Sequence, residues 1–107
     1  MKISVFDIIN SKNAVNQEDG SILYDFLASQ NSSEVVLSFE GIDFLSTLFL
    51  NESIGKMVVT NPKIVSLLKF EYPEGKYLFS SKVDDVIENA LMGDDYDQLV
   101  DAAKMAL

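Results

Sequence analysis

The chain has 107 residues, of which 48% are apolar and 23% are charged, and this composition predicts one globular domain rather than a disordered chain. It carries 17 acidic residues, 8 lysines and no arginine, so its net charge of -9 disfavours binding to nucleic acid or to an anionic membrane surface. The absence of histidine and cysteine excludes a thiolate nucleophile, a Ser-His-Asp triad, disulfides and a zinc site of the usual nitrogen and sulfur kind. We therefore expect a protein that is not an enzyme and that uses no metal or cofactor.

The sequence predicts neither a membrane span nor a secretion signal. No apolar run reaches the roughly 20 residues that a membrane-spanning helix requires. The segment from Met1 to Asp7 is too short and too charged for a signal peptide. No repeat or linker divides the chain into parts. We therefore expect a single domain over residues 1–107 in the cytoplasm.

The first part of the chain predicts a strand, a loop and a helix. Residues 2–9 alternate in polarity, which indicates a strand. Residues 10–16 are polar and rich in asparagine, which is typical of a loop. A helix is expected from Asp19, its predicted N-cap, to about Gln30. The apolar residues of this helix recur on one face: Ile22, Leu23, Phe26 and Leu27.

A second strand and a second helix are predicted next. Residues 34–39 form a mostly apolar run, which favours a strand buried on both faces of a sheet. Residues 40–45 are expected to form a tight connection. Ser46 can then cap a helix that Thr60-Asn61-Pro62 ends. One face of this helix carries Phe49, Leu50, Ser53, Ile54, Met57 and Val58.

Two alternatives stay open after Pro62. Residues 64–68 fit either a helical turn or a strand, and residues 69–72 favour a strand. Residues 76–79 fit either the second strand of a hairpin that turns at Pro73-Glu74-Gly75, or a helix that Pro73 opens.

Helical spacing is clear from Val83, so a helix is expected from there to Met92-Gly93, and Asp94 is expected to cap a last helix that ends near Leu107. This order of elements predicts a small α/β domain with a mixed or parallel sheet covered by helices. The crossovers between its parallel strands are expected to be right-handed. Four aromatic side chains are expected in the core: Phe44, Phe49, Phe70 and Phe79.

A pattern in residues 35–55 carries a resemblance to a known family. A strand ends in Phe39, Gly41 and an aliphatic residue follow, and the hydroxyl residues Ser46 and Thr47 open a helix. That helix continues with an aromatic residue, an acidic residue and a glycine, which are Phe49, Glu52 and Gly55. The segment resembles the STAS-like domain family of unknown function, which is related to the STAS domains of sulfate transporters and anti-sigma-factor antagonists. The resemblance implies a small STAS-like sandwich as the fold.

In the anti-sigma-factor antagonists, a partner kinase with an ATPase fold phosphorylates a Ser or Thr at the start of the second helix. By position that residue corresponds to Thr47, and Ser46 stands where those proteins usually have Asp. The resemblance therefore implies a non-catalytic regulatory domain whose partner is an ATPase-fold (histidine-kinase-like) kinase. Phosphorylation at Thr47 or Ser46 would act as the switch. The implied binding surface comprises Gly41, Asp43, Ser46, Thr47 and Glu52.

The resemblance also supports an alternative function, a small-molecule or nucleotide-sensing module, since some STAS relatives bind such ligands. A separate feature is a set of seven acidic residues between residues 84 and 101, with no base among them. Residues 94–97 lack the glycine and the terminal glutamate of an EF-hand loop. We therefore expect a solvated helix face there rather than a Ca²⁺ or Mg²⁺ site or a pair of catalytic carboxylates.

Overall fold

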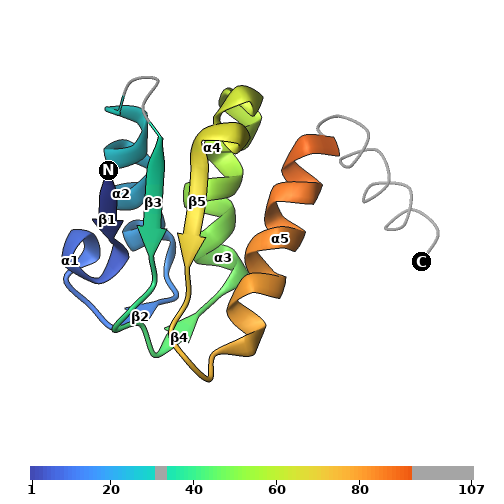
Figure 1. Ribbon diagram of the computed structural model, residues 1–107. Coiled ribbons are helices and arrows are strands. Elements are labelled where there is room, and N and C mark those ends of the chain that lie inside the picture. Colours follow the sequence, from blue (N-terminus) through green and yellow to red (C-terminus); the bar gives the residue numbers. More distant parts are fainter. Residues whose placement is uncertain (31–33, 93–107) are drawn as a thin grey trace.

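A computed structural model describes residues 1–30 and 34–92 (Figure 1). The helix expected from Asp94 to Leu107 lies outside these residues, as do its acidic side chains. In chain order the elements are β1 (Lys2–Ser4), α1 (Val5–Ile9), β2 (Asn13–Ala14), α2 (Gln17–Ala28), β3 (Val35–Ser38), β4 (Phe44–Leu45), α3 (Thr47–Leu50), a π-helical segment (Asn51–Gly55), α4 (Lys56–Thr60), a 3₁₀ segment (Pro62–Leu67), β5 (Leu68–Glu71) and α5 (Tyr77–Met92).

The central sheet consists of β1, β3 and β5 in that order, and all of its strands are parallel, which confirms the α/β fold class. The helices α2, α3 and α4 lie against one face of this sheet (Figure 1). Ile3 and Leu37 are register partners and both are buried. In the adjacent row, Val36 is only half-buried between Lys2 and Lys69, which are exposed. The prediction that this strand is buried on both faces is therefore only partly correct: Ser38, on the same face as Val36, is buried, whereas the polar row of Lys2, Val36 and Lys69 is not.

The predicted first strand is shorter than expected. It ends at Ser4, whose hydroxyl accepts a hydrogen bond from the backbone N–H of Asp7 at 3.2 Å and so caps α1. Val5 and Ile9 are both buried, at the i, i+4 spacing of a helix. The predicted strand over residues 2–9 is therefore correct for residues 2–4 and wrong for residues 5–9, which are helical.

A second, two-stranded parallel sheet forms where a loop and a tight connection were expected. β2 lies within residues 10–16, β4 lies within residues 40–45, and the two strands pair with each other. At the two ends of this pair, the backbone N–H of Asp43 donates to Lys12 O at 2.7 Å, and that of Ser46 donates to Ala14 O at 3.0 Å. These bonds fix the chain directly before the second helix.

The first long helix, α2, begins two residues before its predicted N-cap. Asn16 is the cap, because its Oδ1 accepts from the backbone N–H of Asp19 at 2.7 Å. Asp19 therefore lies in the first turn, where an acidic side chain is also favourable. Leu23 and Leu27 are buried as predicted, while Ile22 is exposed.

The second helix follows the prediction closely. Ser46 caps it, since its Oγ accepts from the backbone N–H of Phe49 at 3.1 Å. α3, the π-helical segment and α4 run on from one another, because Leu50, Asn51 and Gly55 at the junctions keep α-helical dihedral angles. The helical stretch ends at Thr60, before Pro62. The six residues of its predicted inner face are all buried.

The structure decides both alternatives after Pro62. A 3₁₀ helix covers residues 62–67, so the helical reading of that segment is correct, and β5 follows directly. Residues 77–92 form α5, so the hairpin is wrong and the helical reading is correct. The helix begins four residues after Pro73 rather than at it, because a turn intervenes, in which the N–H of Lys76 donates to Pro73 O at 3.2 Å.

Candidate functional site

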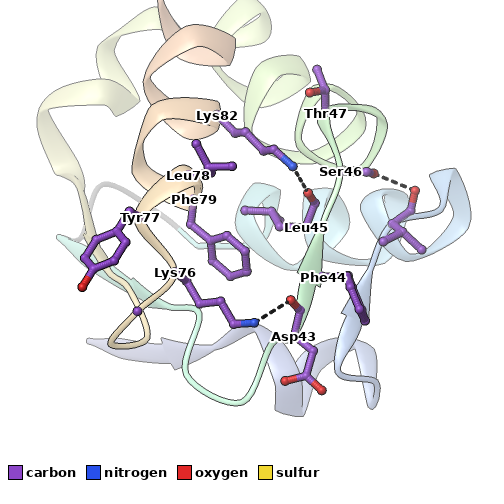
Figure 2. Close-up of a pocket in the computed structure, with 12 residues that line it drawn as sticks. Asp43, Phe44, Leu45, Ser46, Thr47, Lys76, Tyr77, Leu78, Phe79 and Lys82 are labelled. Carbon is purple, nitrogen blue, oxygen red and sulfur yellow. Dashed lines mark hydrogen bonds between the residues drawn. The ribbon is translucent and has the colours of Figure 1, made fainter.

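A groove with a volume of about 680 Å³ lies where β4 and the start of α3 face the start of α5 (Figure 2). One side consists of residues 43–47, and the other consists of residues 75–79 together with Lys82. We call this site the β4–α5 groove. It brings together three of the five predicted surface residues: Asp43, Ser46 and Thr47.

Ser46 is fixed by two hydrogen bonds at the edge of the groove. Its hydroxyl donates to Val15 O at 2.7 Å and accepts from the backbone N–H of Phe49 at 3.1 Å. The first bond connects the helix start to the segment before α2, and the second satisfies a free helix N–H. The proton and one of the two lone pairs of this hydroxyl are therefore used in holding the fold.

Thr47 differs from Ser46 in its surroundings. Its side chain is exposed, and its hydroxyl makes no hydrogen bond to the described part of the chain. In Figure 2 the side chain lies at the end of the groove where Lys82 also lies. Thr47 is thus the hydroxyl residue at this site that a modifying enzyme can reach without breaking a native contact.

The remaining predicted surface residues have separate environments. Asp43 lies at the other end of the groove, where one carboxylate oxygen is 3.9 Å from the ammonium of Lys12. Gly41 is exposed and adopts a φ of +86°, which only glycine tolerates readily. The side chain of Phe6 is its nearest neighbour, and Gly41 does not line the groove.

Glu52 points to α2 rather than into the groove. Its carboxylate accepts from Ser21 Oγ at 3.2 Å and from Gln17 Nε2 at 3.4 Å. The ammonium of Lys56 is 3.8 Å away and also lies over the ring of Tyr24, 4.6 Å from the ring centroid. These contacts give Glu52 a structural role in joining α2 to the π-helical segment.

Two lysines in the groove were missed by sequence reasoning. Lys76 Nζ donates to Asp43 O at 3.2 Å, and Lys82 Nζ, which is partly buried, donates to Leu45 O at 2.7 Å (Figure 2). The sequence did distinguish these two lysines, because they are the only basic residues in the acidic stretch 70–103. Their bonds to Asp43 and Leu45 hold the start of α5 against the start of the second helix.

Large apolar side chains around the groove are exposed. The exposed fractions are 66% for Phe44, 71% for Leu78 and 85% for Tyr77. Leu48, one residue after Thr47, is 54% exposed. The prediction that Phe44 lies in the core is therefore wrong. Phe44, Tyr77 and Leu78 thus give the groove an exposed apolar lining, which we call its apolar surface.

Aromatic residues fill the space between α5 and the sheet. Phe39 is stacked on Phe70 and Tyr72, with ring centroids 6.5 and 5.7 Å away, and meets the ring of Phe79 edge-on. Burial, together with the nearby negative charge of Asp84, raises the pKa of Tyr72 from 10.0 to about 12. This partly buried cluster supports the α5 side of the groove, because Phe79 belongs to the cluster and also lines the groove.

Two other features are absent from the described part of the chain, a metal site and a membrane-spanning helix. In residues 1–30 and 34–92, no three acidic side chains gather in a way that could hold a metal ion. Within the same residues, no helix is long and apolar enough to cross a membrane. The acidic residues of α5 that are described, Asp84, Asp85 and Glu88, are exposed.

Comparison with known proteins identifies the family. No significant match was found among curated proteins or among solved structures. The family described as "STAS-like domain of unknown function (DUF4325)" matches residues 19–74, which is just over half of the chain. The matched region runs from α2 through β5 and includes Ser46 and Thr47. The chain therefore belongs to the family of STAS-like domains of unknown function.

Proposed function

We propose that this STAS-like domain is a non-catalytic regulatory domain, similar in role to the anti-sigma-factor antagonists, and that it binds a partner protein through the β4–α5 groove. The observation that carries the proposal is the apolar surface at the groove, where Phe44, Tyr77 and Leu78 are each more than half exposed. Folded proteins rarely leave such side chains grouped on the surface unless a partner covers them. Aromatic residues of this kind are also enriched in protein interfaces.

The partner proposed is an ATPase-fold kinase, and the modified residue is Thr47. In this step the γ-phosphoryl group of ATP moves to Thr47 Oγ1, the bond between that phosphorus and ADP breaks, and the hydroxyl proton goes to a base on the kinase. Thr47 is favoured over Ser46 because the Ser46 hydroxyl is engaged in two hydrogen bonds that hold the helix start. A phosphate on Thr47 adds nearly two negative charges next to the apolar surface and so changes what can bind there.

Binding can be tested with purified ATPase-fold kinases encoded in the same genome. Titration calorimetry should show binding of one of them to the full chain. Phe44→Ser and Leu78→Ser should each weaken that binding about tenfold or more. Val59→Ser is the matched control, because Val59 is 60% exposed on α4 and does not line the groove. Equal weakening by the control, or no binding to any such kinase, would contradict the docking proposal.

Phosphorylation is tested separately, by incubating the chain with the binding kinase and ATP and measuring its intact mass. The wild-type chain should gain one phosphoryl group, and Thr47→Val should gain none. Thr60→Val should still be modified, since Thr60 lies at the far end of the same helical stretch. Unmodified wild-type protein would argue against the switch while leaving docking as a separate result.

A second candidate function is the sensing of a small molecule or nucleotide. The groove volume of about 680 Å³ is within the range of small-molecule sites, and its two lysines suit an anionic ligand. A ligand that binds only the folded chain raises its melting temperature. A rise with one nucleotide, abolished by Lys82→Gln, would favour this function over protein docking.

A further inference from the structure

Two ammonium groups in the β4–α5 groove are held by backbone carbonyl oxygens instead of carboxylates. Lys76 binds Asp43 O and Lys82 binds Leu45 O. Within the described residues, neither ammonium has a carboxylate oxygen inside 4.0 Å, although the chain has about twice as many acids as bases. By contrast, Lys2, Lys12 and Lys56 are each paired with an acidic side chain. Within the described residues, neither groove ammonium therefore forms an ion pair, although the Asp43 carboxylate lies at the Lys76 end of the groove.

Of the two groove lysines, Lys82 is the one placed beside Thr47. Its ammonium binds the carbonyl of Leu45, two residues before Thr47. Figure 2 shows Lys82 and Thr47 at one end of the groove and Lys76 with Asp43 at the other. The carboxylate of Asp43 also makes that other end unfavourable for a second anion.

We propose that Lys82 is the cation that binds a phosphate carried by Thr47, with the carbonyl of Leu45 holding the ammonium in position beforehand. This inference rests on the proposed function for its choice of Thr47 as the modified residue. An ammonium has three donors, so one can remain on Leu45 O while two are free for phosphate oxygens. Because Lys82 is only partly exposed, its attraction to the phosphate is screened less than that of a surface pair.

This arrangement gives phosphorylation a defined structural result. A charge-assisted hydrogen bond between an ammonium and a phosphate is about twice as strong as one between neutral groups. The phosphate would therefore lie along the groove, against α5, instead of extending into solvent. It would fill the end of the groove near Leu78, which is exposed in the unmodified chain. The modified chain would then present a smaller and less apolar surface to its partner.

The test places phosphothreonine at position 47 of the full chain by chemical or genetic means, so that no kinase is needed. The pKa of the phosphate is then measured by phosphorus NMR titration. With Lys82 present, this pKa should lie about one pH unit below its value in Lys82→Gln, because a nearby positive charge favours the dianion. Lys82→Arg should keep the pKa low. Lys69→Gln is the matched control, since Lys69 is exposed on the polar row of the sheet, and it should leave the pKa unchanged.

Three outcomes would overturn the proposal. An equal phosphate pKa in the wild type and in Lys82→Gln means that Lys82 does not bind the phosphate. If Lys76→Gln changes the phosphate pKa more than Lys82→Gln does, the phosphate lies at the Lys76 end of the groove, which contradicts the proposal. If Lys82→Gln does not fold, the wild-type titration still decides, because a phosphate pKa equal to that of an unfolded phosphothreonine peptide overturns the proposal. Failure of any kinase to modify the chain would instead count against the proposed function alone.

Discussion

At the scale of single residues, Ser46 and Thr47 are neighbours in the chain with opposite environments. Ser46 donates to Val15 O and accepts from Phe49 N, so its hydroxyl belongs to the fold. Thr47 is exposed and its hydroxyl makes no bond within the described residues. A phosphate on Ser46 would remove the proton that is donated to Val15 O, whereas a phosphate on Thr47 breaks no hydrogen bond within the described residues. Substitutions at the two positions should therefore have different effects.

Ser46→Ala should lower the free energy of unfolding by about 1–2 kcal/mol, because it removes a helix cap and the bond to Val15 O. Urea denaturation followed by circular dichroism measures this loss. Ser81→Ala is a suitable control at an exposed position of α5 and should change stability by less than about 0.5 kcal/mol. Equal effects of the two substitutions would show that the cap of Ser46 contributes nothing.

The raised pKa of Tyr72 predicts that the folded chain loses stability at high pH. Burial and the charge of Asp84 raise its pKa to about 12 in the folded chain, against 10.0 for an ordinary tyrosine. Between these two values the unfolded chain gives up a proton that the folded chain keeps. The stabilising contribution is therefore complete below pH 10 and is lost as the pH rises through 12.

The measurement compares melting temperatures of the wild type and Tyr72→Phe from pH 9 upward. The decline above pH 10 should be shallower for Tyr72→Phe, which has no phenol to ionise at this position. Tyrosinate absorbance should also show that the late-ionising group has disappeared. If the melting temperatures of the two proteins fall equally above pH 10, groups other than Tyr72 cause the loss of stability.

At the scale of elements, the contact between α2 and the second helical stretch is unusually close at Gly20. A Cβ atom at this position would lie 2.8 Å from Glu52 Cβ and 2.9 Å from Phe49 O, which is nearer than side chains can approach. Glu52 then joins the two helices through Ser21 and Gln17. Glycine is thus required here by the space between the helices.

Gly20→Ala should destabilise the fold by about 1–3 kcal/mol, because one of the two helices must move. The loss should appear although alanine is the better helix former. Asp25→Ala, at an exposed position of the same helix, is the control and should have little effect. Thermal or urea unfolding measures both. A Gly20→Ala protein as stable as the control would show that the helices separate at little cost.

The long elements could be predicted from the sequence and the short ones could not. α2 and the helix after Ser46 repeat their apolar pattern over several turns, so their existence and inner faces were correct, except that Ile22 is exposed. β2 and β4 have two residues each, which is too few to show a period. Over residues 5–9, Val5 and Ile9 lie on the same face in a strand and in a helix, so the apolar pattern could not distinguish the two. The Ser4 cap, which accepts a hydrogen bond from Asp7 N–H, favours the helix.

Separation along the chain determined which parts of the site were predictable. Asp43, Ser46 and Thr47 are close in the chain, so a local pattern was enough to group them. Lys76 and Lys82 reach the groove from about thirty residues further along, and only the packing of α5 against α3, the π-helical segment and α4 brings them there. Glu52 follows the same local pattern, yet the turn of the helix directs its carboxylate to α2.

At the scale of the whole molecule, charge is unevenly distributed. The net charge is -9, while the groove contains two lysines bound to carbonyl oxygens. Three ion pairs are formed within the described residues, and in all of them the lysine side chain is at least half exposed. Exposed pairs of this kind contribute at most about 1 kcal/mol each. Repulsion between the excess acidic groups should therefore outweigh attraction in the folded chain.

This balance predicts that added salt stabilises the protein. Raising NaCl from about 10 to 150 mM shortens the Debye length from about 30 Å to about 8 Å, which screens long-range repulsion more than it weakens three local ion pairs. The melting temperature should therefore rise by a few degrees. Replacing two exposed acids of α5, Asp85→Asn with Glu88→Gln, should raise the melting temperature at low salt and reduce its dependence on salt. A melting temperature that falls as NaCl is added would mean that the ion pairs dominate, and the lysines of the groove would then be the first place to look for an additional acidic partner.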